Sequence, residues 1–177
     1  MSEATLSGFP TLQSALITKV RVGDLNDIGT GVVHNGSRFM HFATPTGALE
    51  TVPGFEPAFK GYVNCGADWL SFDADGEHAR IHLRSIAKTE QGYAIDFRFQ
   101  GVIQLAPEVQ KIFNMQPDAA TVSFGFATGQ HQFLVADPVL KKLEHSTFVS
   151  NVRILVGENG LAVETRLSLV IAAKVIN

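Results

Sequence analysis

The sequence predicts an all-β chain that folds into a single closed antiparallel β-barrel with one or two short helices. Apolar and polar residues alternate with period two over most of the 177 residues, which is typical of strands with one buried face. Gly and Pro interrupt the alternation at short intervals, and the Asn35-Gly36 pair is typical of a two-residue hairpin. Helical spacing is confined to two brief segments, and many hairpin-linked strands with little helix favour a barrel or a sandwich.

The predicted strands follow the alternating segments in order. The strands are expected over residues 15–22, 29–34, 57–63, 68–73, 80–88, 93–104, 121–128, 147–156 and 161–171. A two-residue turn at Asn35-Gly36 would pair Val32 with Phe39 and Thr30 with His41.

The hairpin between residues 80–88 and 93–104 has a predictable register. Its loop, which ends in Gly92, is typical of a three-residue turn with glycine in the left-handed position. Arg84 then faces Arg98, and Leu83 faces Phe99. This register keeps apolar and polar faces apart, whereas a slip of one residue would mix them.

Two short helices are expected between the later strands. Residues 107–114 begin with proline and carry apolar side chains at helical spacing. Asp137 can cap a second turn that begins at Pro138 and extends to about Glu144.

Composition restricts the classes of partner. The net charge is −3 and 18% of the residues are charged, and no cluster of Lys and Arg occurs, so neither nucleic acid nor a membrane is an expected partner. The single cysteine, Cys65, cannot form an internal disulfide, which favours a reducing, cytoplasmic compartment. The N-terminus has no signal-peptide pattern. We expect one domain over residues 1–177, with residues 1–14 as a loosely ordered arm, and homodimer formation is left open.

Residues 61–69, Gly-Tyr-Val-Asn-Cys-Gly-Ala-Asp-Trp, carry a family resemblance. They resemble the Gly-Gly-Ala-Asp-Trp signature of the domain-of-unknown-function family 3237. Weaker similarity continues through residues 81–84, 89–92, 126–128 and 143–149. The resemblance covers roughly residues 15–171 and implies a lipocalin-like, or calycin-like, antiparallel barrel.

The chain departs from the family pattern at several positions. His82 stands where the family tends to carry an acid, Cys65 where it carries glycine, and Glu144 where it carries asparagine. Phe99 lies where relatives are more polar. We therefore expect a more apolar pocket than in the relatives. Membership alone names no reaction.

Asp68 is the first candidate catalytic residue. If Trp69 faces water, Asp68 shares the other face of its strand with Leu70 and Phe72. A carboxylate on an apolar face is costly unless it is paired, or else its pKa rises. The alternative is a structural aspartate that binds amides of the 64–67 turn.

Arg84 and Arg98, with His82, form the second candidate group. In one interpretation they face the lumen and hold an anionic oxygen such as a phenolate or enolate, and the resemblance favours this because Arg84 lies at a signature position. In the other they lie on the surface, where Asp96 relieves the repulsion of the two arginines.

The remaining candidates are a histidine and a set of aromatic side chains. His41 lies on a strand face with Phe39 and is either a core residue or a catalyst, whereas the other histidines (His34, His78, His131 and His145) are expected in loops or on the surface. The expected apolar wall of the substrate site consists of Trp69, Phe97, Phe99, Phe124 and Phe126.

These observations favour a cofactor-independent acid–base enzyme, that is, an isomerase, cyclase or lyase. The sequence lacks a dinucleotide fingerprint, a phosphate loop, a nucleophile elbow and a metal-ligand pattern, so we expect neither a cofactor nor a metal. The expected substrate is a small hydrophobic, aromatic or polyketide-like secondary metabolite bound in the barrel, and an intramolecular oxa-Michael ring closure is one example. The alternatives are a non-catalytic carrier of such a ligand and an interaction module with a filled barrel.

Overall fold

Antiparallel strands close into a barrel in the computed structural model, which describes residues 7–31 and 36–173. Eight strands form the closed barrel and two extend it, and about 62% of the chain is strand, which confirms the predicted fold class. The strands are β1 (Thr11–Arg21), β2 (Leu25–Thr30), β3 (Arg38–Ala43), β4 (Thr46–Thr51), β5 (Lys60–Phe72), β6 (His78–Thr89), β7 (Ala94–Gln104), β8 (Val122–Val135), β9 (Phe148–Gly157) and β10 (Gly160–Ile171).

The order of neighbouring strands is β2-β3-β5-β4-β1-β10-β9-β8-β7-β6, and pairing of β5 with β6 closes the ring. Strands β2 and β3 are the additional pair, because β3 pairs with the second half of β5 while β4 pairs with the first half. Closure leaves few free strand edges, which protects the sheet from pairing with other chains.

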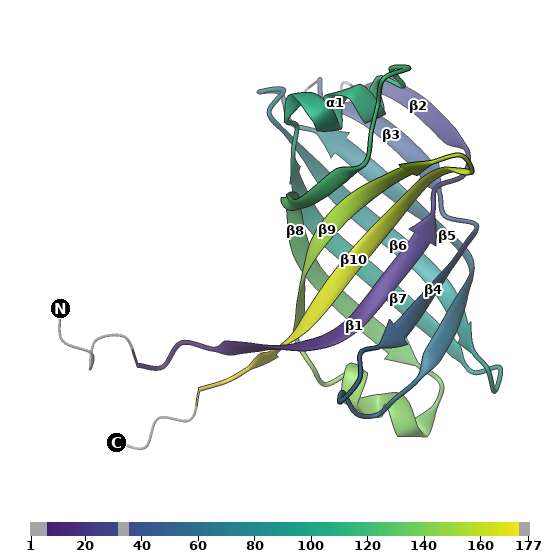
Figure 1. Cartoon of the computed structure of the whole chain (residues 1–177), viewed down its shortest axis with the longest axis vertical. Helices are drawn as coiled ribbons and strands as arrows, with labels where there is room; N and C mark the ends of the chain where they lie inside the picture. The colour runs from purple at the N-terminus through teal and green to yellow at the C-terminus, as the bar shows by residue number, and fades with distance from the viewer. Residues whose placement is uncertain (1–6, 32–35, 174–177) are drawn as a thin grey trace.

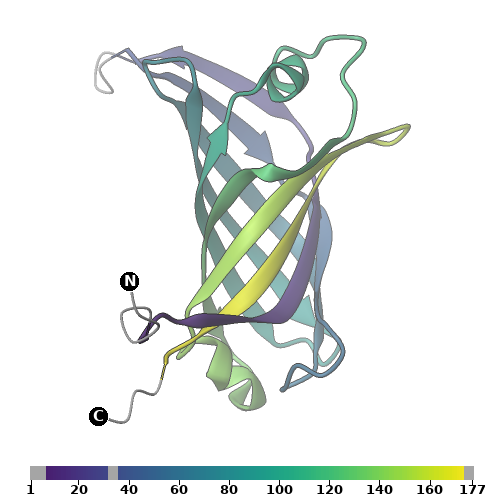
Figure 2. The ribbon, with the colours of Figure 1, turned by 60° about the vertical axis from the view of Figure 1, so that its left-hand side comes forward.

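Two short helices lie at opposite ends of the barrel (Figures 1 and 2). Helix α1 (Pro107–Phe113) covers one end, and the 3₁₀ helix η3 (Pro138–Leu143) lies at the other. Both predictions are confirmed, and the Asp137 side chain accepts a hydrogen bond from the amide of Val139 at 2.9 Å. No helix among the described residues is long and apolar enough to cross a membrane.

The β6–β7 register is confirmed. Arg84 pairs with Arg98 and Leu83 with Phe99, and the pairing is regular along the whole hairpin. The alternation of apolar and polar side chains on both strands selects this register, because only one face is buried.

The predicted register of the first hairpin is wrong. Thr30 pairs with Arg38, whereas His41 pairs with Asn26. The connection from β2 to β3 is therefore longer than two residues, and Val32 and Asn35 lie outside the described residues. Gly36 does have a positive φ of 81°.

Several other strands also differ from prediction, including β8, which was predicted to end at residue 128 but extends to Val135. Segments 57–63 and 68–73 are parts of the single strand β5, because a bulge lets the strand continue through Asn64 and Cys65. Strand β4 was missed because it is short and begins after a proline. Strand β1 begins at Thr11, within the expected N-terminal arm, and its first residues pair with the end of β10 in a ribbon that leaves the barrel.

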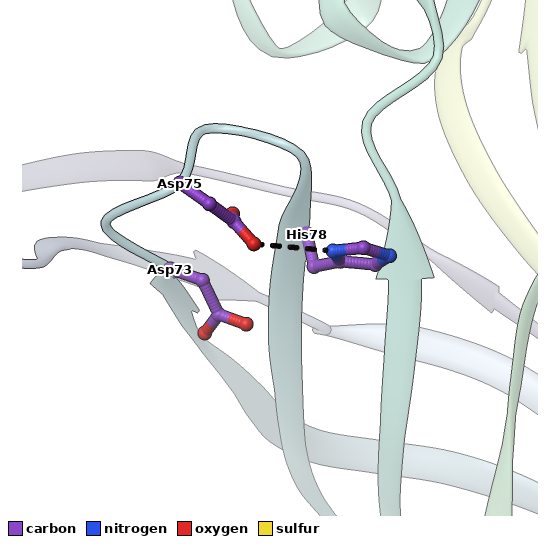
Figure 3. A group of neighbouring side chains, drawn as sticks. All are labelled: Asp73, Asp75 and His78. Atoms are coloured by element: carbon purple, nitrogen blue, oxygen red, sulfur yellow. Dashed lines mark ion pairs between the residues drawn. The ribbon is translucent and has the colours of Figure 1, made fainter.

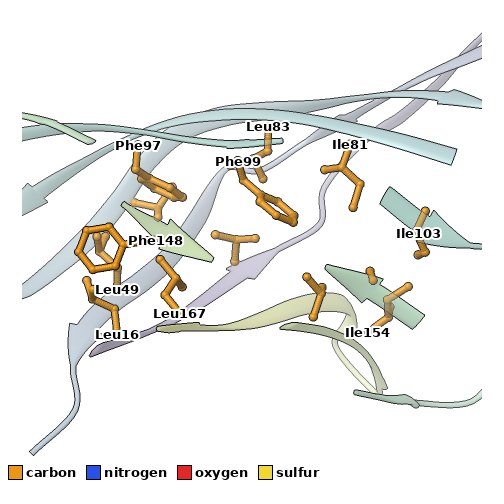
Figure 4. Packing of buried hydrophobic residues seen from close by; sticks show 14 of the residues in the cluster. Leu16, Leu49, Ile81, Leu83, Phe97, Phe99, Ile103, Phe148, Ile154 and Leu167 are labelled. Atoms are coloured by element: carbon orange, nitrogen blue, oxygen red, sulfur yellow. The ribbon is translucent and has the colours of Figure 1, made fainter. Parts of the chain in front are cut away.

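The half of the barrel nearer η3 is filled by large apolar side chains. Figure 4 shows buried residues of both halves, with Leu16, Leu49, Phe148 and Leu167 of this half gathered together. The ring of Phe148 packs edge-on against Phe55 and Phe133, with centroids 6.3 and 5.4 Å away. Burial of each such side chain stabilises the fold by about 1.5–3 kcal/mol. Other fully buried members of this packed half are Leu16, Leu49, Phe97, Leu140, Leu143 and Leu167.

Candidate functional site

The half of the barrel nearer α1 contains a partly open cavity of about 320 Å³. This volume is roughly twice that of the ~150 Å³ protein cavity that accepts a benzene molecule. Most of the wall is aliphatic or aromatic, and of the described residues that line it none is Lys, Arg or His. The apolar wall includes Val20, Leu70, Ile81, Leu83, Phe97, Phe99, Ile103, Ile112, Phe113, Ile154 and Val163.

A bulge in β5 turns Asp68 into this cavity. Val63 faces inward and is buried, so strict alternation would place Asp68, five residues later, on the outer face. The register against β6 shifts by one residue between Val63 and Cys65, and beyond the shift the even-numbered residues face inward. The inner face thus carries Asp68 together with Leu70, as the sequence predicted, and both line the cavity.

The carboxylate of Asp68 occupies a gap in the β5–β6 ladder. The pairing of β5 with β6 is interrupted between the pair Asp68–Leu83 and the pair Ser71–Arg80. In this gap the amide of His82 donates a hydrogen bond to Oδ1 of Asp68, at 3.1 Å. This bond, together with the amide of Trp69, holds the carboxyl group in place.

Burial raises the pKa of Asp68 to about 7, and the hydrogen bonds from the His82 and Trp69 amides only partly oppose this rise. Among the described residues, no cation forms an ion pair with this carboxylate. An acid that is half ionised at neutral pH can both accept and donate a proton, which is the requirement for acid–base catalysis.

Three threonine hydroxyls add neutral polar groups to the wall. Thr44 is bonded to Ser85, with 3.1 Å between the two hydroxyl oxygens. Gly66 permits this contact, because a Cβ at that position would lie 2.0 Å from Oγ of Ser85. Thr18 and Thr165 lie opposite each other on β1 and β10, and both line the cavity.

Phe99 forms part of the boundary between the cavity and the packed half. Its ring leans over two glycines, because a Cβ on Gly101 or Gly129 would lie 2.8 or 2.4 Å from ring carbons of Phe99. On its other side the ring stacks on His131, with centroids 4.5 Å apart and 11° between the planes. Phe97 and Phe99 therefore stand where the sequence predicted an apolar wall.

His131 lies inside the barrel, so its prediction as a loop or surface residue is wrong. Nε2 lies 2.9 Å from Oγ of Ser150, and Nδ1 has no partner among the described residues. Burial lowers the pKa of His131 to about 3, so the ring is neutral at pH 7.

A family model for proteins of unknown function, DUF3237, matches residues 10–170. The chain belongs to this family. No curated protein matches the sequence. The assignment agrees with the resemblance of residues 61–69, within which the bulge and Asp68 lie.

Solved structures share the fold of this DUF3237 chain at low sequence identity. A conserved protein of unknown function from Rhodopseudomonas palustris has a TM-score of 0.72 at 14% identity, with 93% of this chain and 100% of that one covered. A β-barrel-like protein from Acinetobacter baumannii has a TM-score of 0.67 at 18% identity, covering 91% and 96%. A protein described as an enzyme from Penicillium herquei has a TM-score of 0.55 at 14% identity, covering 89% and 94%.

The expected polar group of the lumen lies outside the barrel in this family member. His82 and Arg84 are exposed, and the guanidinium groups of Arg84 and Arg98 both bind Asp96, at 2.8 and 2.9 Å. These two ion pairs hold the pKa of Asp96 below its usual value against the effect of burial. The placement of His82, Arg84 and Arg98 in the lumen is therefore wrong, since the apolar face of a barrel strand turns inward.

His41 and Trp69 also face outward. Their rings lie 4.6 Å apart on neighbouring strands, and Nδ1 of His41 is 3.1 Å from Nδ2 of Asn26. Neither residue lines the cavity, although both were candidate site residues. The alternation of β3 explains this, because Met40 and Phe42 occupy its inner face.

The two later phenylalanines do not reach the cavity either. Phe124 lies under the guanidinium groups of Arg153 and Arg166, 5.0 and 5.2 Å from its ring centroid. Phe126 packs partly buried against the core without lining the cavity. The register of β8 against β9 is irregular between Val122 and Ala127, which breaks the regular alternation of this stretch.

One group of side chains among the described residues could hold a metal ion: Asp73, Asp75 and His78 in the β5–β6 turn (Figure 3). Arg80 donates two hydrogen bonds to Oδ2 of Asp73, at 2.6 and 3.0 Å. A guanidinium in contact with a ligand carboxylate opposes cation binding, and Asp75 already accepts from the amide of Glu77 at 2.8 Å. The geometry is that of a hydrogen-bonded turn.

A second hollow, of about 350 Å³, lies beside η3 and the outer face of β8. Its charged side chains are already paired: Arg98 binds Asp96, and Glu144 binds Lys141 at 2.9 Å. The inner cavity is the better candidate, because it alone of the two combines an apolar wall with an unpaired carboxylate.

The threonines of the cavity wall could not be singled out from the sequence. Thr18, Thr44 and Thr165 are each about 97% buried or more, yet threonine is also a common strand residue and draws no attention by itself. The signal available was the alternation of residues 161–171, in which Thr165 shares a face with Val163 and Leu167.

Proposed function

We propose that this protein is a cofactor-independent acid–base enzyme that acts on a small, largely apolar molecule in the cavity beneath α1, with Asp68 as the group that transfers the proton. The observation that carries the proposal is a carboxylate in an apolar cavity with no cation beside it among residues 7–31 and 36–173. Such a carboxylate is a stronger base than one in water, because the site does not solvate its charge.

The geometry around Asp68 favours a role in proton transfer to or from a bound molecule, and not a role in binding a charged ligand. The amides of His82 and Trp69 hold the carboxyl group, with the His82 amide 3.1 Å from Oδ1, and Asp68 lines the cavity, where a bound molecule can reach it. The wall offers hydroxyl groups and no positive charge, which favours a neutral substrate. Isomerases, cyclases and lyases that move one proton need no more than a shaped pocket, a positioned base and a hydrogen-bond donor.

The similarity to a solved enzyme is consistent with this proposal. The Penicillium herquei protein that is described as an enzyme has the same fold over 89% of this chain. At 14% identity the likeness shows the fold alone, so the assignment of a role to Asp68 depends on the cavity.

A carrier of apolar molecules is the second candidate, and the largely apolar wall favours it. In a carrier Asp68 would serve only to fill the gap in the β5–β6 ladder. Replacement by asparagine separates the two candidates, because asparagine can still accept the hydrogen bond from the His82 amide but cannot transfer a proton.

The test uses 5-nitrobenzisoxazole, a neutral bicyclic probe. Loss of its C3 proton to a carboxylate turns the C–H electron pair into the nitrile bond and breaks the N–O bond, giving a coloured cyanophenolate. We expect the wild-type protein to accelerate this reaction, with a rate that rises with pH through the pKa of Asp68. Asp68→Asn and Asp68→Ala should each reduce the rate by about 10²-fold or more.

The matched control is Asp24→Asn, which removes an exposed carboxylate that lies beside Gly23 and Leu25 at the rim but does not line the cavity. It should leave the rate unchanged. Equal binding of the neutral dye Nile red by wild type and Asp68→Asn, with no acceleration by either, would instead identify a carrier.

A further inference from the structure

The cavity has a second polar position, formed by Thr18 and Thr165. The two residues are direct cross-strand partners on β1 and β10, and each is 3% exposed. Cross-strand partners have Cβ atoms about 4.5–5.5 Å apart, so the two side chains stand next to each other on the cavity wall. This wall lies away from Asp68, because β4 separates β5 from β1 in the barrel.

Neither hydroxyl has a hydrogen-bond partner within the described chain. The other buried threonine of the cavity, Thr44, is bonded to Ser85. Among the described residues, two side-chain atoms are completely buried and lack a hydrogen-bond partner: Nδ1 of His131 and Nε of Arg153. The hydroxyl oxygens of Thr18 and Thr165 also lack a partner but are not completely buried, so they are open to the cavity.

Local structure does not require threonine at these positions. The next inward-facing residues toward α1 on the same two strands are Val20 and Val163, which also line the cavity. Valine has the same shape and strand preference as threonine without a hydroxyl to desolvate. Two adjacent unpaired hydroxyls in an apolar wall therefore indicate a polar group on the bound molecule.

We infer that the cavity takes a neutral carbonyl compound whose oxygen accepts hydrogen bonds from the hydroxyls of both Thr18 and Thr165. A carbonyl oxygen has two lone pairs and no proton, so it can accept from two donors at once. A carboxylate or phosphate ligand is disfavoured, because the described wall has no cation to neutralise it and Asp68 adds a negative charge.

This inference rests on the proposed function and specifies its chemistry. The Asp68 carboxylate removes a C–H proton activated by the carbonyl, directly or through a conjugated double bond. The C–H electron pair forms a carbon–carbon double bond, and the carbonyl oxygen becomes an enolate oxygen that the two hydroxyls stabilise. Protonated Asp68 then returns the proton to another carbon, so the net reaction is an isomerisation that needs no co-reactant.

The experiment compares two probes of nearly equal shape, 2-acetonaphthone and 2-ethylnaphthalene, by isothermal titration calorimetry. We expect the wild-type protein to bind the ketone more tightly than the hydrocarbon. The Thr18→Val/Thr165→Val double variant should weaken ketone binding by on the order of tenfold, with the affinity for the hydrocarbon unchanged. Thr128→Val, on the outer face of β8, is the matched control and should change neither affinity.

A stability measurement separates a ligand role from a structural one. Without ligand, the double valine variant should melt at the same temperature as wild type or above it, because two unpaired buried hydroxyls are removed. A lower melting temperature would assign the threonines to the fold and overturn the inference.

Equal affinity of the wild-type protein for ketone and hydrocarbon would also overturn the inference. The proposed function would survive that result if Asp68→Asn still lost the benzisoxazole reaction. Failure of both probes to bind would count against the cavity as the ligand site, and so against the inference and the proposed function together.

Discussion

Two titratable side chains of the barrel interior, the partly buried Asp68 and the buried His131, exchange protons in opposite directions when the protein unfolds. The pKa of Asp68 is raised from 3.8 to about 7 in the folded state, so between these values unfolding releases a proton. The pKa of His131 is lowered from 6.5 to about 3, so in that range unfolding takes up a proton. The contribution of Asp68 to stability is thus lost as pH rises toward 7, whereas that of His131 is lost as pH falls below 6.5.

The two effects are similar in size. One pH unit changes each contribution by about 1.4 kcal/mol wherever the folded and unfolded states differ by a whole proton. From pH 5 to pH 6.5 the Asp68 contribution falls by about 2 kcal/mol and the His131 contribution rises by roughly the same amount. Because the two changes cancel, we expect these two residues together to cause almost no change in the wild-type free energy of unfolding between pH 5 and pH 6.5.

Single variants should reveal separately how each of the two residues makes the free energy of unfolding depend on pH. Asp68→Asn keeps an acceptor for the His82 amide and leaves His131 as the titrating group, so stability should rise by about 2 kcal/mol from pH 5 to 6.5. His131→Phe keeps the stacking on Phe99 and leaves Asp68, so stability should fall by about 2 kcal/mol over the same range. The double variant should be flat again.

Urea denaturation followed by circular dichroism at several pH values measures these slopes. In thermal melts the change corresponds to roughly 4–8 °C for a chain of this size. The contributions of the surface carboxylates cancel when a variant is compared with wild type. A flat profile for Asp68→Asn or for His131→Phe would refute the reasoning, because it would mean that the other residue is not held in its neutral form by burial.

Three further predictions concern the walls of the cavity. Gly66→Ala should destabilise the fold by about 1–3 kcal/mol in denaturant titrations, since its Cβ would overlap the Ser85 hydroxyl; unchanged stability would contradict the described Thr44–Ser85 contact. Ile81→Trp should fill the cavity and abolish Nile red binding without unfolding the protein, and persistent binding would place the dye elsewhere. Arg84→Ala should alter stability by less than about 1 kcal/mol and leave the benzisoxazole rate unchanged. A tenfold loss of rate would instead show that the arginines of the outer face take part in the reaction.

Side-chain periodicity predicted the barrel well because one face of each strand is buried. It gave the β6–β7 register correctly, since only one register keeps Leu83 and Phe99 on a common face. It also grouped Asp68 with the inward face of its strand. These features follow from local alternation and turn chemistry, which a single sequence displays directly.

The site was harder to predict, because long-range packing determines it. The bulge at Asn64–Cys65, which turns Asp68 inward, has no local sequence signal beyond a glycine nearby. His131 lies between Gln130 and Gln132 and resembles a surface residue, but the period of β8 places it on the inner face with Phe133. Arg84 was assigned to the lumen from its position in a family signature, although its charge already favoured the outer face.

Asp68 is a partly buried acid without an ion-pair partner among the described residues, at the site where we propose that a neutral molecule binds. The most direct measurement is the pH titration of the Asp68 carboxyl carbon by NMR, with Asp68→Asn to assign the signal. We expect a midpoint near pH 7 that rises when 2-acetonaphthone fills the cavity and displaces water. A midpoint near 4 that does not respond to the ketone would contradict this expectation, because Asp68 would then be an ordinary ionised carboxylate that only joins β5 to β6.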